Sequence, residues 1–245
     1  MTLSTRVTRL LGITQPVIQA GMSVHTSPEL VAAVSNAGGL GLVGSVFREP
    51  DDLHAAVNAV RNLTDRPFGA NIVLAEPWQA YLDILLAEGV PVVAAGGIAD
   101  GRGLAAALLL GADGVLIGTR FLATLEASVP EGWKRALLVA HPEDAWQTDV
   151  PDILDAHAWP GATVRVLANA PVHAWHGHEA EIAQYREQIR ASLDRAWQAD
   201  EADGYFLYAG QSAGLVHDII PAAEVVRRMV QEAEDALRGI CSSTR

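Results

Sequence analysis

The chain has 245 residues, a length that suits one (β/α)8 barrel, one doubly wound α/β domain or two small domains. Half of the residues are hydrophobic and 19% are charged, which excludes a disordered chain and predicts a sizeable core. The formal charge of −12 argues against general nucleic-acid binding, although a phosphate group can still bind locally.

The sequence gives no sign of a membrane segment or a disulfide. Its longest apolar runs are far shorter than the roughly 20 residues that span a bilayer, and no signal-peptide core follows the basic start. The only cysteine, Cys241, lies in a polar tail, so no intrachain disulfide is possible and a cysteine-ligated zinc site is improbable. We expect a cytoplasmic protein that binds neither membranes nor nucleic acid, and no metal.

The first half of the chain alternates short apolar runs with amphipathic segments. Expected strands cover residues 16–21, 40–46, 67–74, 90–95 and 114–121. Expected helices between them cover residues 30–37, 49–63, 76–89 and 100–111. This alternation predicts a parallel sheet that is buried on both faces.

The second half shows no further strand–helix repeat. An apolar run at 164–167 is followed by a polar helix at 179–197 and a last helix at 222–237. We therefore expect residues 125–245 to form a mostly helical covering region.

Two glycine turns follow the fourth and fifth expected strands. Gly96 and Gly97 lead directly into a helix, and Gly118 and Thr119 come after the next strand. Glycine lets a ligand approach the backbone closely, and a helix N-terminus offers unpaired N–H groups to phosphate. The two turns together predict one phosphate site. The alternative is that the glycines serve only tight packing.

Two amide side chains and one thioether lie near other strand ends. Asn71 and Gln19 sit at the ends of apolar strands, where a buried amide needs a partner. A bound heterocycle or a neighbouring backbone group can supply it. Gly21 allows a flat ring to approach, while Met22 can flank that ring or pack in the core.

Several motifs together resemble the nitronate monooxygenase family, formerly called 2-nitropropane dioxygenases. Related flavin-dependent enoyl-ACP reductases share most of these motifs. The matching segments cover nearly the whole chain and lie at residues 19–22, 27–30, 35–41, 68–71, 94–101, 118–126 and 209–214.

The resemblance implies an FMN-binding (β/α)8 (TIM) barrel, a flavoprotein oxidoreductase that oxidises alkyl nitronates with dioxygen. The residues that it implies for cofactor binding are Gln19, Gly21, Met22, Asn71, Gly96, Gly97, Leu116, Ile117, Gly118 and Thr119. Among them, Asn71 would contact the flavin, and Gly97 with residues 116–119 would hold its phosphate.

The sequence departs from the family between Asn71 and Gly96. Several strand–helix units of the family are missing there, together with a Gly-Gly-His motif whose histidine acts as base or substrate anchor. About five strands remain of the eight that a closed barrel needs. We expect residues 1–124 to form a partial barrel with the flavin phosphate site, and residues 125–245 to return to it through the motif at 209–214. If the sheet opens, its strand order should be 3-2-1-5-4.

The histidines that remain offer weak replacements. His25 follows the first strand and is the one candidate for a catalytic base, although the family uses no residue there. His173, His176 and His178 resemble a metal cluster, but a solvated loop is the better interpretation.

The motifs and the missing segment leave three candidate functions. The first is an FMN-dependent oxidoreductase of the nitronate monooxygenase type that acts on a small molecule. The second is a catalytically impaired flavin-binding remnant, and the third is an enoyl-ACP reductase-like enzyme. Missing strands would leave open sheet edges, which a homodimer can cover.

Overall fold

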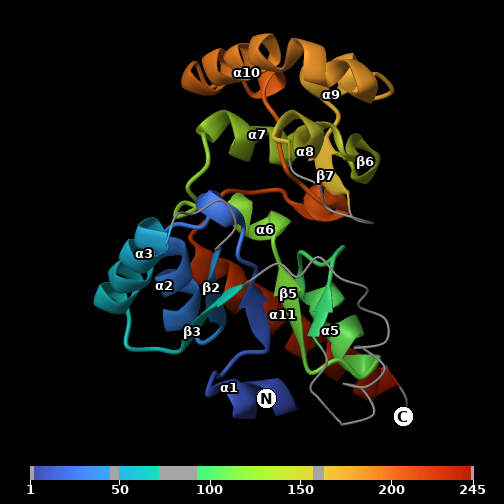
Figure 1. The fold of residues 1–245 in the computed structure, drawn as a ribbon. Helices are drawn as coiled ribbons and strands as arrows, with labels where there is room; N and C mark the ends of the chain where they lie inside the picture. The colour runs from blue at the N-terminus through green and yellow to red at the C-terminus, as the bar shows by residue number, and fades with distance from the viewer. Residues whose placement is uncertain (1–2, 45–49, 72–92, 157–162, 244–245) are drawn as a thin grey trace, which may run out of the picture. The chain divides into compact units, whose positions relative to one another are not determined.

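The structure is a computed structural model that describes residues 3–44, 50–71, 93–156 and 163–243 (Figure 1). The chain forms two compact units. We call residues 1–128 with 219–245 the sheet unit, and residues 129–218 the insert unit. The expected helix at 76–89 lies outside the described residues.

The sheet unit is built on five parallel strands. They are β1 (Val17–Gln19), β2 (Leu40–Gly44), β3 (Phe68–Asn71), β4 (Val93–Ala95) and β5 (Gly114–Ile117). Their spatial order is β3-β2-β1-β5-β4, which confirms the parallel sheet and matches the order expected for an opened one. In the described part of the chain, β3 and β4 are the two ends of this sheet.

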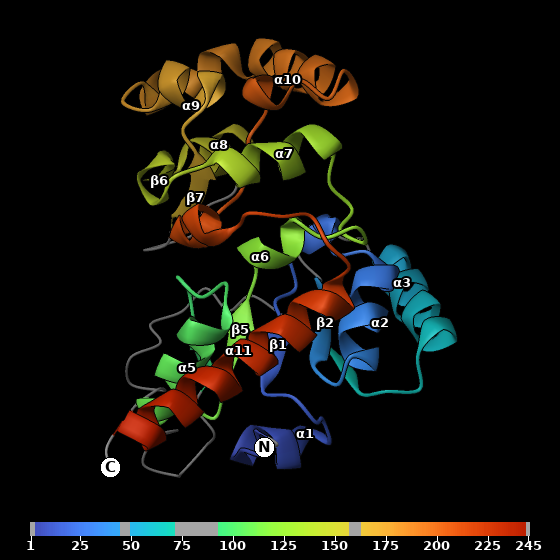
Figure 2. The ribbon, with the colours of Figure 1, turned by 180° about the vertical axis from the view of Figure 1, so that it is seen from behind.

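Helices connect and cover the strands. They are α1 (Arg6–Leu11), η1 (Ser23–His25), α2 (Pro28–Asn36), α3 (Pro50–Leu63), α5 (Gly101–Leu109), α6 (Thr119–Leu122) and α11 (Ala222–Ser243). Seen from behind in Figure 2, α2 and α11 lie in front of the strands. Local chemistry starts α2: the Ser27 hydroxyl accepts from the Leu30 N–H at 3.1 Å, and Pro28 occupies the first turn.

Both faces of the sheet carry apolar side chains, as expected for a parallel sheet. Val17, Val115 and Ile117 are at most 1% exposed. The alternate positions Ile18 and Leu40 form a second cluster with half-buried Leu116, Leu42 and Val93. The core thus fixes which strand ends meet at the carboxyl edge of the sheet.

The insert unit is mostly helical but contains an antiparallel pair of strands that the sequence did not predict. Its elements are α7 (Glu131–Val139), η2 (Pro142–Asp144), β6 (Ala145–Thr148), α8 (Val150–Leu154), β7 (Val164–Leu167), α9 (Ala170–Trp175), η3 (Glu179–Glu181), α10 (Ile182–Gln198), η4 (Ala202–Gly204) and η5 (Gln211–Leu215). Strands β6 and β7 pair antiparallel, with Trp146 opposite Val166. None of the described helices in the chain is long and apolar enough to cross a membrane.

Two boundaries differ from the sequence expectation. The fifth strand ends at Ile117 instead of Phe121, because the backbone at Gly118 leaves the extended region and α6 starts there. The last helix belongs to the sheet unit, where it packs on α5 and α2, although the sequence assigned it to the covering region. An amphipathic helix finds its partner through tertiary packing, which residue order alone does not reveal.

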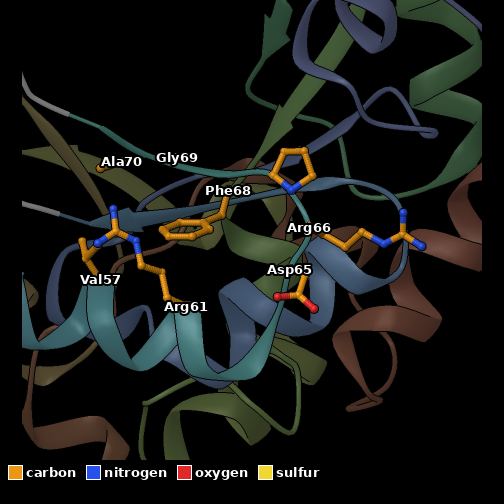
Figure 3. A pocket seen from close by; sticks show the side chains of 8 residues that line it. Val57, Arg61, Asp65, Arg66, Phe68, Gly69 and Ala70 are labelled. Carbon is orange, nitrogen blue, oxygen red and sulfur yellow. The ribbon is translucent and has the colours of Figure 1, made fainter.

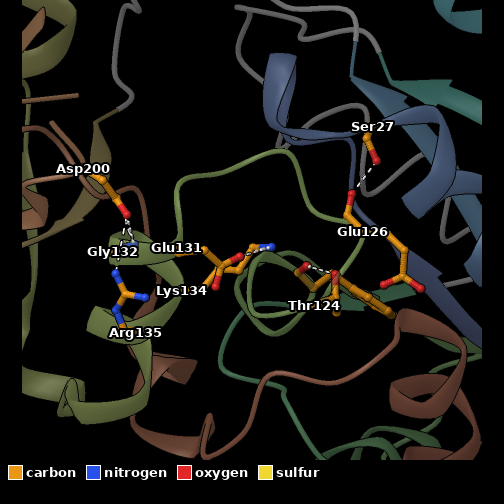
Figure 4. A network of polar contacts seen from close by, with 9 residues as sticks. Ser27, Thr124, Glu126, Glu131, Gly132, Lys134, Arg135 and Asp200 are labelled. Atoms are coloured by element: carbon orange, nitrogen blue, oxygen red, sulfur yellow. Dashed lines mark hydrogen bonds and ion pairs between the residues drawn. The ribbon is translucent and has the colours of Figure 1, made fainter. Parts of the chain in front are cut away.

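Asp200, at the end of α10, forms hydrogen bonds and an ion pair with α7 in the insert unit (Figure 4). Its carboxylate accepts from the Gly132 N–H at 2.9 Å and lies 3.5 Å from Arg135. It also accepts from the Tyr205 hydroxyl, and burial together with this carboxylate raises the pKa of Tyr205 to about 12. Pro130 cannot supply a side-chain cap to α7, so Asp200 performs that role from the end of α10.

We expect Asp200→Ala to lower the free energy of unfolding by about 1–2 kcal/mol, because the first turn of α7 loses its acceptor. Asp200→Asn should lower the free energy of unfolding less, since the asparagine amide oxygen can still accept the Gly132 N–H. Asparagine also tolerates the left-handed backbone at φ +53°. Urea unfolding of both variants measures the difference, and equal losses would contradict the capping role.

Candidate functional site

The register of the sheet brings the two glycine turns together. Ala95 of β4 pairs with Leu116 of β5, so Gly97 and Gly118 each lie two residues beyond the last pair. Parallel strands end at the same edge, where α/β proteins place their ligands. The predicted phosphate residues are therefore neighbours at the carboxyl edge.

The backbone at Gly96 and Gly97 faces open space. Their φ angles are +88° and +73°, values that residues with a side chain rarely adopt. Within the described residues, a Cβ built on either glycine would have no heavy atom within 4 Å. Packing therefore does not explain these glycines, and the turn leaves room for a ligand against its main chain.

The helix that follows does not offer the free N-terminus that the sequence predicted. The Gly101 N–H donates to Glu232 Oε2 and the Gly103 N–H donates to Asp100 Oδ1, both at 2.9 Å. Burial by itself raises the pKa of Asp100, but the bonds from Gly103 and Arg102 outweigh it and lower that pKa. This part of the prediction is wrong, because two protein carboxylates already occupy the start of α5. The sequence carried no signal for Glu232, which lies 131 positions away.

The turn after β5 is also accessible from one side. A Cβ on Gly118 would make only ordinary contacts, the nearest being Met22 Sδ at 3.8 Å. Thr119 begins α6, and both it and Gly118 are partly exposed. Leu116 is half-buried in the second apolar cluster, whereas Ile117 is 1% exposed and its carbonyl accepts from the Ala20 N–H at 2.8 Å.

Asn71 and Gly21 lie against each other at the ends of β3 and β1. A Cβ on Gly21 would be 2.0 Å from Asn71 Oδ1, so only glycine leaves room for that amide. Met22 follows directly, and its N–H donates to Thr26 Oγ1 at 2.7 Å. The structure thus brings together Gly21, Met22, Asn71 and Gly118.

Gln19 is bound to the backbone, one of the two possibilities that the sequence left open. The side chain is fully buried, and its Oε1 accepts from the Leu42 N–H at 3.1 Å. Its Nε2 donates to the carbonyl oxygens of Ala20 and Leu42. This amide joins β1 to β2.

His25 ends the short helix η1, three residues after Met22. Its N–H donates to the Met22 carbonyl, and its own carbonyl accepts from the Ser128 N–H. Burial lowers the pKa of the His25 imidazole, against the opposing effect of a hydrogen bond with the Ser128 backbone. The ring is therefore neutral at pH 7.

The lowered pKa of His25 predicts a pH dependence of stability. The unfolded chain binds a proton near the ordinary pKa of 6.5, while the folded chain resists it. Stability is thus complete above that pH and declines as the pH falls below it. Urea unfolding between about pH 7 and pH 5 should show a shallower decline for His25→Asn than for the wild type. If the free energy of unfolding depends on pH in the same way in both proteins, His25 does not cause the decline.

His173, His176 and His178 belong to the insert unit, whereas the glycine turns belong to the sheet unit. His173 and His176 place their rings against Trp146, with centroids 5.0 Å and 5.5 Å from its ring. His173 lies in α9, and His178 pairs with Glu181 at 3.3 Å. Within the described ranges, no group of three or more potential ligands is placed to hold a metal ion.

A hollow of about 530 Å³ lies beside β3 and α3 (Figure 3). Its lining includes Val57, Arg61 and Phe68, and none of the residues that the sequence predicted for a cofactor. In Figure 3 the Arg61 and Arg66 side chains point to opposite sides of Phe68. The hollow therefore does not extend the glycine-lined edge.

Comparisons with known proteins find relatives along nearly the whole chain. A family model described as nitronate monooxygenase matches residues 4–84 and 80–232. A (3aS,4S,5R,7aS)-5-hydroxy-7a-methyl-1-oxo-octahydro-1H-indene-4-carboxyl-CoA dehydrogenase from Mycobacterium tuberculosis is 27% identical, over 95% of this chain and 97% of that protein. A probable nitronate monooxygenase from Staphylococcus saprophyticus is 25% identical, over 97% and 99% of the two chains.

Among solved structures, FabK from Thermotoga maritima is similar with a TM-score of 0.79 and 29% identity, covering 98% of this chain and 99% of the other. The fold is thus shared along nearly the whole chain. Because the family model matches most of the sequence, this chain belongs to the nitronate monooxygenase family.

Proposed function

We propose that this protein is an FMN-dependent oxidoreductase that oxidises alkyl nitronates with dioxygen. The observation that carries the proposal is the pair of open glycine turns, Gly96–Gly97 and Gly118–Thr119, at neighbouring strand ends. Membership of the nitronate monooxygenase family supports the same function.

The residues at this edge fit a flavin mononucleotide. Gly96 and Gly97 present main chain that a side chain would obstruct, which suits a phosphate bound by backbone N–H groups. Gly118 and Thr119 complete this cradle from the adjoining strand. Gly21 and Met22 follow β1, the neighbour of β5, and would lie beside the ring system together with Asn71, whose amide packs against Gly21.

A bound flavin would supply the transfer of electrons between substrate and oxygen, and the protein residues have other tasks. The two glycine turns hold the phosphate, and Asn71 orients the ring through its amide. We assign proton acceptance to His25, because its imidazole is neutral and lies in the same loop as Gly21 and Met22. Gln19 acts indirectly, by fixing the ends of β1 and β2.

We further propose that the sheet is a shortened barrel lacking about three strand–helix units of the usual eight. The family model supports this, since it matches in two blocks that meet at residues 80–84. The alignment with the M. tuberculosis relative also spans 343 positions, more than the 245 residues of this chain. A homodimer would cover the open sheet edges at β3 and β4. Light scattering would measure the mass of the assembly and so show whether a dimer forms.

An oxygen electrode tests the activity. Reconstituted protein should consume oxygen when an alkyl nitronate is added, and His25→Asn should lower kcat with little change in bound FMN. Turnover of NAD(P)H that depends on an enoyl thioester would replace this function with a reductase activity. FMN binding without either turnover would identify a catalytically impaired remnant.

A further inference from the structure

The start of α5 is bound to α11 at a position next to the proposed phosphate turn. Glu232 Oε2 accepts the Gly101 N–H at 2.9 Å. A Cβ on Gly101 would lie 2.4 Å from the Met229 carbonyl oxygen and 2.5 Å from the Ala233 nitrogen. The first residue of α5 therefore rests directly on the backbone of α11.

A short, closely packed segment connects the Gly101–Glu232 contact to the glycine turn. Only Ile98, Ala99 and Asp100 separate Gly97 from Gly101. Ala99 is 4% exposed, and a Cβ on Gly103 would meet Ile98 Cγ2 at 3.0 Å. A shift of Gly101 would thus be transmitted to Gly97, where no packed side chain restrains the backbone within the described residues.

We propose that Glu232 is a positioning residue for the flavin phosphate, an inference that rests on the proposed FMN binding. Its carboxylate fixes the C-terminal end of the glycine turn through the Gly101 N–H. Because Glu232 and Asp100 accept the Gly101 and Gly103 N–H groups, these two donors at the start of α5 are already used. The phosphate is left with Gly96–Gly97 and Gly118–Thr119.

The role depends on an acceptor oxygen at the right distance, so variants of Glu232 separate geometry from charge. Glu232→Gln keeps an acceptor oxygen and removes the charge. Glu232→Ala removes both, and Glu232→Asp keeps the charge on a shorter side chain. Glu224→Ala is the control on the same helix, because Glu224 pairs with Arg227 and Arg228 on the surface of α11.

Fluorescence quenching of FMN and of riboflavin by the apoprotein measures the effect, since riboflavin lacks the phosphate. We expect Glu232→Ala to weaken FMN binding about tenfold, the size of one lost hydrogen bond, and to leave riboflavin binding unchanged. Glu232→Asp should show the same selective loss, while Glu232→Gln and Glu224→Ala should bind both flavins like the wild type.

Equal losses for FMN and riboflavin, or unchanged FMN binding in both Glu232→Ala and Glu232→Asp, would overturn the positioning role. If Glu232→Ala does not fold, the Asp and Gln variants carry the same comparison. A wild-type protein that binds neither flavin would overturn the proposed function itself, which is a different outcome.

Discussion

Replacing Gly97 by valine is expected to weaken FMN binding about a hundredfold, a loss of two charge-assisted hydrogen bonds to phosphate. The added side chain enters the open space beside the turn and strains a backbone at φ +73°. Titration of the apoprotein with FMN, followed by flavin fluorescence, gives the dissociation constant.

Gly111→Val provides a matched control for this experiment. Gly111 also has a left-handed backbone, at φ +99°, and open space around its Cβ, but it precedes β5 at the opposite edge of the sheet. Both variants should lose about 1–2 kcal/mol of stability from backbone strain. Only Gly97→Val should lose FMN, and an equal loss of FMN in both would contradict a phosphate site at Gly97.

Replacing Gly41 by alanine should destabilise the protein by about 3 kcal/mol, near the upper end of what overpacking causes. A Cβ at Gly41 would be 2.3 Å from the Val31 carbonyl oxygen and 2.7 Å from Val31 Cα. These are backbone atoms of α2, so the helix itself has to move away from β2.

Gly69→Ala tests whether this cost comes from backbone contact. Gly69 also lies in a strand, but its Cβ would meet the ends of flexible side chains, Leu42 Cδ2 at 2.8 Å and Leu40 Cδ2 at 4.0 Å. A flexible side chain can move, and alanine loses less conformational entropy on folding than glycine does, so the change should stay within about 1 kcal/mol. Urea unfolding of both variants should show this difference, and similar losses would contradict close α2–β2 packing as its cause.

The sheet could be predicted from sequence because its signals are local and repeated. Apolar runs ending in glycine give the strands, and Asp100 and Ser27 mark helix starts through their own side chains. The strand order followed from the neighbours that each strand has in a barrel. The glycine turns at 96–97 and 118–119 were recognisable for the same reason, since each is a short motif after a strand.

The sequence was less informative where distant residues meet. Glu232 blocks the start of α5 from 131 positions away, and no local pattern marks such a contact. Strand β6 was missed because Ala145–Thr148 is short and mixes polar with apolar residues. The expected fifth strand includes residues 119–121, which lie in α6, because a single helical turn has no period of its own.

The central claim is that the glycine-lined edge of the sheet holds FMN, and gel filtration after reconstitution tests it most directly. Apoprotein mixed with excess FMN should elute with one flavin per chain and with the visible absorbance of a protein-bound flavin. A protein peak without flavin absorbance, from wild-type chain that unfolds cooperatively in urea, would contradict the account.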